Sequence, residues 1–223
     1  MSNPEVPPHL TRPGLARRVD ELRAGLGRIP VNLLAEHTGA ACQTPGAGKG
    51  EFRFSLLDMP VTLTFPDFIA RNANNEPLPL PIQGLTVYYF HTADGAPLTG
   101  KWISFADLPN GRIYEPAFQS YSGNEIVKAF GLNIAGFCRA CEKAGGQPVA
   151  LGDAAYAFQA LPRLPLLVNF WCGDEDFSST CKILFDASIS HYLPTDVVAI
   201  LGGMLVRSIM AWKGELQQPV LKR

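Results

Sequence analysis

The sequence predicts an α+β protein in which an antiparallel β-meander packs against two long helices within a single domain. Three apolar runs separated by two polar breaks predict the strands of the meander, over residues 155–161, 164–171 and 181–186. The first break is the pair Pro162-Arg163, and the second is an acidic loop over residues 172–180. Breaks this short favour strands that pair in sequence order with their neighbours.

Two segments with apolar residues at helical spacing predict the long helices, over residues 124–144 and 195–212. Ser122 and Glu125 have the spacing of a capping box, in which a hydroxyl and a carboxylate satisfy free amide donors at a helix N-terminus. Apolar residues of the last helix cover more than one stripe, so we expect it to be largely buried.

The rest of the chain is predicted to contain shorter elements. Residues 1–13 are rich in proline and predict a flexible lead-in, so the single domain is expected to cover residues 14–223. Residues 39–50 are expected to form a loop; their TPGAGKG lacks the first glycine and the final Ser or Thr of a phosphate-binding loop. The other predicted elements are helices over residues 15–26 and 32–37 and strands over residues 52–56, 61–65 and 101–105. Residues 82–92 are aromatic and continuously apolar, which fits a helix or a buried strand, and we favour the helix.

Charge and composition narrow the classes of partner. The net charge of −1 and pI of about 6.4 predict no attraction to nucleic acid or to an anionic membrane surface. The first thirty residues have no apolar segment typical of a secretion signal, and the longest apolar run, Val197–Val206, is too short to span a bilayer. Five cysteines, an odd number, favour free thiols in a reducing compartment. We therefore expect a cytoplasmic protein whose partner is a small molecule or another protein.

Three segments carry a resemblance to a known family: GAPLTGKWISFADLPNGRIYEPAF (95–118), GDAAYAFQALPRLPL (152–166) and WCGDEDF…ILFDASISHYLP (171–194). In this order they resemble domain-of-unknown-function family 3786, over roughly residues 80–205. That family occurs chiefly in anaerobic bacteria and archaea, and some members carry a fused cysteine-rich domain like those that hold iron–sulfur clusters. The resemblance implies a role in iron–sulfur, corrinoid or other tetrapyrrole metabolism. This chain departs from the fused members because its amino-terminal third contains only Cys42.

Four cysteines lie in the carboxy-terminal half. Cys138 and Cys141 have the CxxC spacing of redox pairs, but they lie past the middle of the predicted helix, where its dipole does not favour thiolates, so we expect structural cysteines. Cys172 and Cys181 flank the acidic loop. All four would bind zinc or an iron–sulfur cluster only if the helix brings its two thiols to that loop.

His91 and His191 are candidate axial ligands for a corrinoid or a haem. Neither has a second histidine at metal-ligand spacing, and a lone histidine is more often structural or exposed.

An acidic cluster is predicted at one end of the meander, where Asp153 should face Asp174, Glu175 and Asp176. Carboxylates gathered in this way repel one another unless a cation compensates. Three alternatives stay open. The cation is internal, from Arg112 or Lys101; it belongs to a basic partner; or it is a divalent metal, for which the candidate ligands are Asp153, Asp174, Glu175, Cys172 and Cys181.

Two functional hypotheses follow. The first is a non-catalytic binding or accessory domain in anaerobic cofactor metabolism, with His91 and His191 among its cofactor-binding residues. The second is an enzyme of unknown reaction with a polar cleft built from Arg112, Tyr114, Asp153, Arg163, Asp174 and Glu175; the first four are also candidate cofactor-binding residues. A further hypothesis is a structural ion pair between Arg163 and Asp186, since both lie at the same end of the predicted meander. The alternative is that Arg163 binds the carboxylate of a substrate.

Overall fold

The computed structural model describes residues 12–46 and 48–216, which divide into two compact units. The first unit contains the described residues up to 55 together with 59–96 and 191–194, and the second contains the rest. Mixed helices and antiparallel sheets confirm the α+β class. The single domain over residues 14–223 stays a prediction. Of the predicted lead-in, residues 1–11 lie outside the described residues, while Arg12 and Pro13 belong to the first helix.

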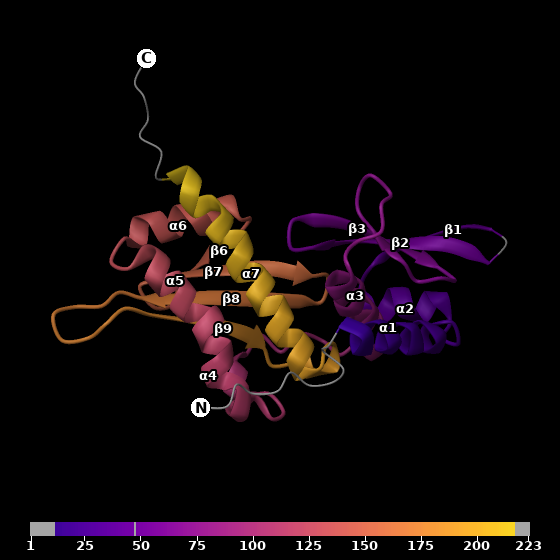
Figure 1. Ribbon diagram of the computed structural model, residues 1–223, viewed down its shortest axis with the longest axis horizontal. Helices are drawn as coiled ribbons and strands as arrows, with labels where there is room; N and C mark the ends of the chain where they lie inside the picture. Colours follow the sequence, from indigo (N-terminus) through magenta and orange to yellow (C-terminus); the bar gives the residue numbers. More distant parts are fainter. Residues whose placement is uncertain (1–11, 47, 217–223) are drawn as a thin grey trace, which may run out of the picture. The chain divides into compact units, whose positions relative to one another are not determined.

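The first unit contains a four-stranded sheet with the order β1-β2-β3-β4 (Figure 1). Its strands are β1 Ala41–Gly46, β2 Lys49–Leu56, β3 Met59–Phe65 and β4 Ala70–Arg71. The prediction of a loop over residues 39–50 was wrong, because Ala41–Gln43 pair in antiparallel register with Glu51–Arg53 of β2. The two predicted strands are confirmed as β2 and β3.

Three helices lie on one side of this sheet: α1 Arg12–Leu26, α2 Val31–Thr38 and α3 Leu80–Thr92 (Figure 1). The ring of Phe90 on α3 packs against Phe52 and Phe54 of β2, with ring centroids 4.9 and 5.5 Å apart. The α3 segment is apolar on all sides, which suits a helix buried between a sheet and other helices. All three predicted helices are confirmed.

The second unit contains a five-stranded antiparallel sheet with the order β5-β9-β8-β7-β6. Its strands are β5 Trp102–Ser104, β6 Gln147–Val149, β7 Ala154–Leu161, β8 Leu164–Trp171 and β9 Thr180–Asp186. The predicted meander is confirmed as β7, β8 and β9. The short strands β5 and β6 extend it at the two edges, and β6 was not predicted.

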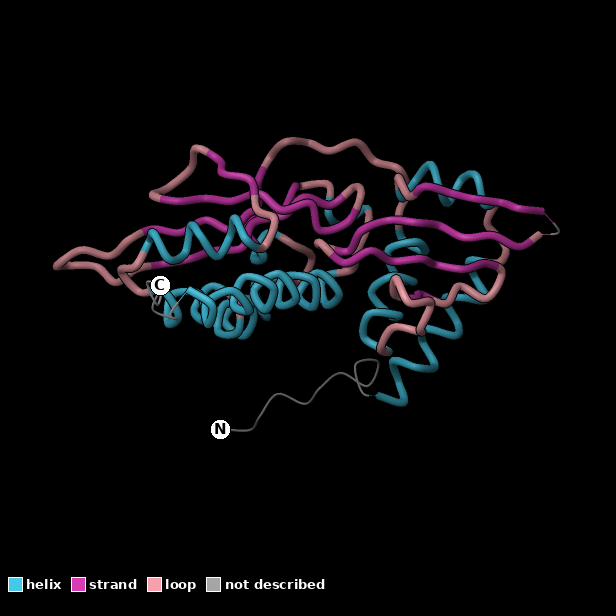
Figure 2. The backbone as a smooth tube through the Cα atoms, turned by 90° about the horizontal axis from the view of Figure 1, so that it is seen from above, coloured by secondary structure: helices cyan, strands magenta, loops and turns pink. Residues whose placement is uncertain are grey.

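Four helices cover one face of this sheet (Figure 2). They are α4 Gly111–Tyr121, α5 Gly123–Phe130, α6 Ile134–Lys143 and α7 Thr195–Leu216; two 3-10 turns, η2 Phe105–Asp107 and η3 Ile189–His191, complete the chain. Helix α4 was not predicted. Its Phe118 packs on Phe185 of β9 and stacks on Phe105 at 4.3 Å.

The predicted helix over residues 124–144 is divided into α5 and α6 by Gly131, which has φ +55° and ψ −118°. The predicted capping box is also wrong. The hydroxyl of Ser122 donates to the carbonyl of Phe118 at 2.6 Å and caps no helix. A capping box exists instead at Ser104, whose amide and hydroxyl both donate to the carboxylate of Asp107. The sequence predicted two long helices on the meander. The structure has three short helices, α4, α5 and α6, and one long helix, α7.

The last helix, α7, is apolar over most of its length. By length and composition alone Thr195–Lys213 could cross a membrane, although core helices of soluble proteins meet the same criterion. In this protein 44% of that segment is buried, and Gly202 lies against Phe118 of α4. The expected cytoplasmic location stays a prediction.

Candidate functional site

The acidic hairpin loop between β8 and β9 is stabilised by two carboxylates that accept hydrogen bonds from its backbone amides. One carboxylate oxygen of Asp174 accepts from the amides of Asp176 and Phe177, at 2.9 and 2.8 Å. Asp153 accepts from the amide of Cys172 at 2.8 Å. Because the Asp153 and Asp174 carboxylates each bind backbone donors, they stabilise the loop without an added cation.

The predicted divalent-metal site finds no support in this geometry. Within residues 12–46 and 48–216, no three His, Cys, Asp or Glu side chains are grouped so that they could hold a metal ion. The predicted ligand set of Asp153, Asp174, Glu175, Cys172 and Cys181 is therefore not assembled as a site.

The two predicted internal cations lie elsewhere. Arg112 and Lys101 are neighbours of Asp107, whose pKa is lowered first by its hydrogen bonds from Ser104 and then by these two charges. Arg112 lies in the first turn of α4, as does Tyr114, which is 52% exposed. The prediction that Arg112 or Lys101 compensates the acidic loop was wrong, because α4 begins beside β5 and η2.

Arg163 lies far from the acidic loop. It occupies the turn between β7 and β8, whereas Cys172 follows the other end of the eight-residue strand β8. A strand of this length spans about 26 Å. The six polar residues of the enzyme hypothesis therefore do not form one cleft. The carboxylate of Asp186 is satisfied by Thr99, Gly100 and Ser188, so its burial does not require Arg163, and that ion pair stays a prediction.

The four cysteines of the second unit lie near one another. Burial first, and then the neighbouring thiols of Cys181 and Cys138, raise the pKa of Cys141. Burial, then Asp153 and then Cys138, raise the pKa of Cys172. The thiols of α6 thus lie close enough to Cys172 and Cys181 for their charges to interact, but among the described residues no three of them are grouped so that they could hold a metal ion.

The four thiols differ in their exposure to solvent. Cys141 and Cys181 are fully buried, whereas Cys138 and Cys172 are half-buried. Because α6 starts at Ile134, Cys138 lies in the middle of a ten-residue helix and not past the middle of a long one. Both cysteines lie beyond the first turn of α6, where the free amides of a helix N-terminus are found, so the structural interpretation of Cys141 is consistent with its place in the core.

The two candidate histidines differ in their surroundings. A Cβ atom on Gly25 would come within 3.0 Å of Nε2 of His91, so this ring lies against α1. Burial and the charge of Arg18 lower the pKa of His91, which favours the neutral imidazole. The Nε2 atom of His91 is therefore directed at protein backbone.

His191 lies on the surface of the first unit and is bonded to Asp94. Its Nδ1 lies 2.7 Å from Oδ2 of Asp94, and both side chains are about half exposed. A carboxylate can only accept, so Nδ1 carries the proton and the lone pair of the neutral ring is on Nε2. The hydrogen bond from His191, followed by that from the amide of Ala96, lowers the pKa of Asp94.

Neighbouring residues hold this pair in place. The hydroxyl of Tyr192 donates to the carbonyl of Ala96, and its ring stacks on Tyr89 with centroids 6.0 Å apart. Nδ1 of His37 lies 3.1 Å from the carbonyl of Ala93. The residues next to the pair, Ala93 and Tyr192, are thus held in place by these contacts. Asp94 was missed by the sequence reasoning because 97 residues separate it from His191.

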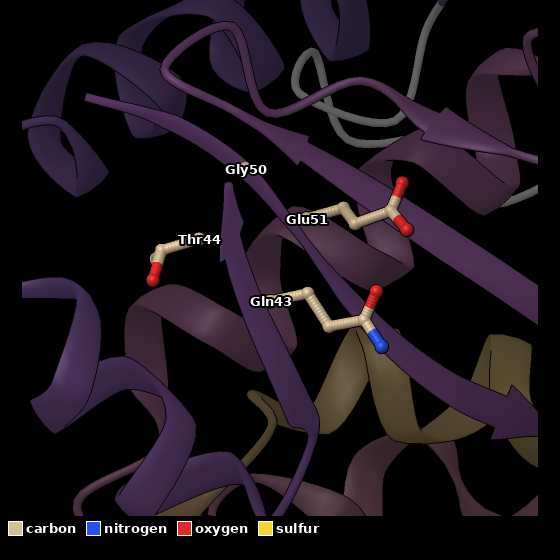
Figure 3. A pocket seen from close by; sticks show the side chains of 4 residues that line it. All are labelled: Gln43, Thr44, Gly50 and Glu51. Atoms are coloured by element: carbon tan, nitrogen blue, oxygen red, sulfur yellow. The ribbon is translucent and has the colours of Figure 1, made fainter. Parts of the chain in front are cut away.

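A shallow hollow of about 580 Å³ lies on the hairpin of β1 and β2 (Figure 3). It is lined by Gln43, Thr44, Gly50 and Glu51, and contains none of the predicted site residues. A Cβ on Gly50 would lie 2.3 Å from the carbonyl of Gln43, so glycine is required for this strand pairing. The hollow adds no group of convergent charges to the candidate site.

The chain is an α+β protein with two antiparallel sheets. A hydrogen-bonded histidine–carboxylate pair lies on the surface of its first unit. Its residues 32–208 match a family described as a domain of unknown function (DUF3786), so the chain belongs to that family. The match extends the expected region, about 80–205, to include most of the first unit. No curated protein and no solved structure matches the chain.

Proposed function

We propose that the protein is a non-catalytic binding or accessory domain for a metal-containing cofactor, with His191 as the residue that ligates the metal. The observation that supports this proposal is the hydrogen bond between Nδ1 of His191 and Oδ2 of Asp94 on an exposed surface. Histidines that bind metals commonly donate their second ring N–H to a carboxylate, which fixes the tautomer and strengthens the ligand. With Nδ1 bonded to Asp94, the atom of His191 that would ligate the metal is Nε2.

The donor types of the chain favour some cofactors over others. A single imidazole is an axial ligand suited to a corrinoid or a haem, and either would supply a redox-active metal centre when bound. An iron–sulfur cluster requires about four convergent thiolates. No such group of three or more ligands occurs among the described residues, so the thiols do not fit a cluster. An oxygen-ligated divalent metal fits poorly because Asp153 and Asp174 accept backbone amides.

The alternative, an enzyme of unknown reaction, receives less support. Its residues lie in the first turn of α4, in the turn between β7 and β8, and at the acidic loop, which are separate parts of the second unit. The expected partner classes remain a small molecule or a protein, with neither nucleic acid nor membrane.

Spectroscopy of the full chain tests this proposal. Protein purified without oxygen is titrated with hemin and, separately, with aquocobalamin, and the visible spectrum is recorded. We expect a change in the absorption bands that is abolished in His191→Ala and is weaker in Asp94→Asn. His91→Ala serves as the matched control and should behave as the wild type. Spectra that do not change with either compound, or that change equally in His191→Ala, would contradict the assignment.

A further inference from the structure

Two half-buried thiols take no part in the proposed histidine site. Cys138 lies on α6, and Cys172 directly follows β8. They come from separate segments, but the acidic loop after Cys172 is tied to the turn before α6, because the hydroxyl of Ser179 donates to the carbonyl of Gly131 at 3.2 Å.

The position of Cys172 is fixed by the strand before it. Phe170 and Cys172 are two residues apart, so they extend toward the same face of the sheet. Phe170 stacks on Phe137 of α6 with ring centroids 4.9 Å apart, which identifies this face as the one covered by α6. The amide of Cys172 donates to Asp153 at 2.8 Å, which holds the backbone at this point.

The position of Cys138 is fixed by β7. It follows Phe137, whose ring also meets Tyr156 of β7 edge-on at 6.0 Å. The hydroxyl of Tyr156 donates to Glu142, one turn further along α6, at 3.1 Å. Burial, together with hydrogen bonds to Cys138 and Glu142, raises the pKa of Tyr156, so the hydroxyl stays protonated between the helix and the strand.

We propose that Cys138 and Cys172 form a dithiol modification site that closes to a disulfide on reaction with a small-molecule disulfide. One cysteine thiolate attacks the small disulfide, whose S–S bond breaks and releases one small thiol. The second cysteine then attacks the mixed disulfide, forming the Cys138–Cys172 bond and releasing the other small thiol. Two protein thiols are oxidised, one small disulfide is reduced to two thiols, and the cysteine protons pass to those thiols.

The other two cysteines of the unit do not compete for this reaction. Cys141 and Cys181 are both 0% exposed, so a dissolved disulfide cannot reach them in the folded protein. Burial raises the pKa of each, which suppresses the reactive thiolate. The reaction is therefore confined to the accessible pair.

The closed bond would join α6 to the end of β8. A cross-link between residues 138 and 172 restricts the unfolded chain and thereby stabilises the folded one. Since its pKa is raised, Cys172 forms more thiolate as the pH rises above neutral, and we expect closure to accelerate in the same direction.

The experiment uses the reduced full chain and oxidised glutathione. We expect intact-mass spectra to show the loss of two hydrogens without a retained glutathione, and peptide mapping to find Cys138 linked to Cys172. The melting temperature should rise on oxidation and return when dithiothreitol is added. Closure should be faster at about pH 9 than at about pH 7.

Three variants make the assignment specific. Cys138→Ser and Cys172→Ser should each retain glutathione as a mixed disulfide, because the second thiol that displaces it is missing. Cys42→Ser, in the other unit, should close as the wild type does. A wild-type protein that retains glutathione on both cysteines, links either one to Cys141 or Cys181, or does not react would overturn the proposal.

Discussion

The carboxylate of Asp186 binds Thr99 twice, since Oδ1 accepts from both its amide and its hydroxyl at 3.0 Å. Oδ2 accepts from the amide of Gly100 at 2.7 Å, and the amide and hydroxyl of Ser188 complete five hydrogen bonds. Asp186 is only 3% exposed. One buried charge therefore fixes the segment before β5 to the turn after β9, and both lie in motifs that carry the family resemblance.

Replacing Asp186 with Asn tests the strength of this junction. The amide nitrogen of Asn cannot accept, so buried donors lose their partner while the volume stays the same. We expect the free energy of unfolding to fall by about 2–4 kcal/mol in urea titrations. Asp176→Asn, at an exposed position of the acidic loop, should change it by less than about 0.5 kcal/mol. Equal effects of the two variants would argue against the junction.

The same carboxylate gives a pH dependence with a defined sign. Burial tends to raise the pKa of Asp186, but hydrogen bonds from Ser188 and Thr99 outweigh it and leave the pKa below its usual value. Such a group stabilises the fold above its unfolded pKa of about 4 and loses this contribution as the pH falls through the folded pKa. We expect the stability of the wild type to fall below about pH 4 more steeply than that of Asp186→Asn. Parallel curves would contradict this contribution.

The strands were predicted more accurately than the helices for physical reasons. The three runs of the meander are apolar, bounded by turn residues and paired with their sequence neighbours, so local pattern determines them. The helix over residues 124–144 was predicted as continuous because apolar residues keep their spacing through Gly131. Only its backbone conformation, φ +55°, reveals the break. Helix α4 was missed because Asn110-Gly111 and Pro116 are typical of turns, yet Phe118 anchors this segment on the sheet.

The candidate site was predictable only in part. His191 was identified as a possible ligand from its residue type, but its partner Asp94 lies just after α3, and no local pattern links them. Likewise, α6 is positioned on the sheet by the packing of Phe137 on Phe170, and no local pattern in the sequence indicates that contact. Arg112 and Lys101 were assigned to the wrong carboxylate because the position of α4 depends on tertiary contacts.

Gly131 is expected to be required for the turn between α5 and α6. Its φ of +55° and ψ of −118° lie in a region open to glycine and costly for any residue with a Cβ. No atom lies within 4 Å of a Cβ placed there, so Gly131→Ala isolates the backbone cost, about 1–3 kcal/mol of unfolding free energy. Gly27→Ala, where the nearest atom is 3.8 Å away and φ is not in the left-handed region, is the control. Similar stability of both variants would show that the turn tolerates a side chain.

The Asp94–His191 pair is testable without a cofactor. Because the hydrogen bond from His191 is the largest cause of the lowered pKa of Asp94, His191→Ala should move that pKa up toward its ordinary value. The amide of Ala96 should keep part of the lowering. Carboxyl carbon chemical shifts of Asp94, followed against pH by NMR, measure the change, and Asp107 in the same spectra is the internal control. An unchanged Asp94 titration would mean that the pair is not formed in solution.

Gly123 lies at a close approach of α5 to the five-stranded sheet. A Cβ at this position would lie 1.9 Å from the carbonyl oxygen of Cys181 and 2.4 Å from Nε2 of Gln119, which itself donates to that oxygen at 2.8 Å. The carbonyl belongs to β9, where Cys181 is paired with Phe170, so it cannot move without disturbing the sheet. Accommodation of a methyl group therefore requires α5 to move away from β9.

We expect Gly123→Ala to lower the free energy of unfolding by about 3 kcal/mol or more, because overpacking against backbone is relieved less easily than against a flexible side chain. Gln119→Ala separates the two contributions: it removes the hydrogen bond and leaves the close approach, and should cost only about 1 kcal/mol. If the clash with the carbonyl dominates, adding Gln119→Ala to Gly123→Ala will not restore stability. Recovery in the double variant would show instead that the Gln119 side chain, and not the strand, limits the space at Gly123.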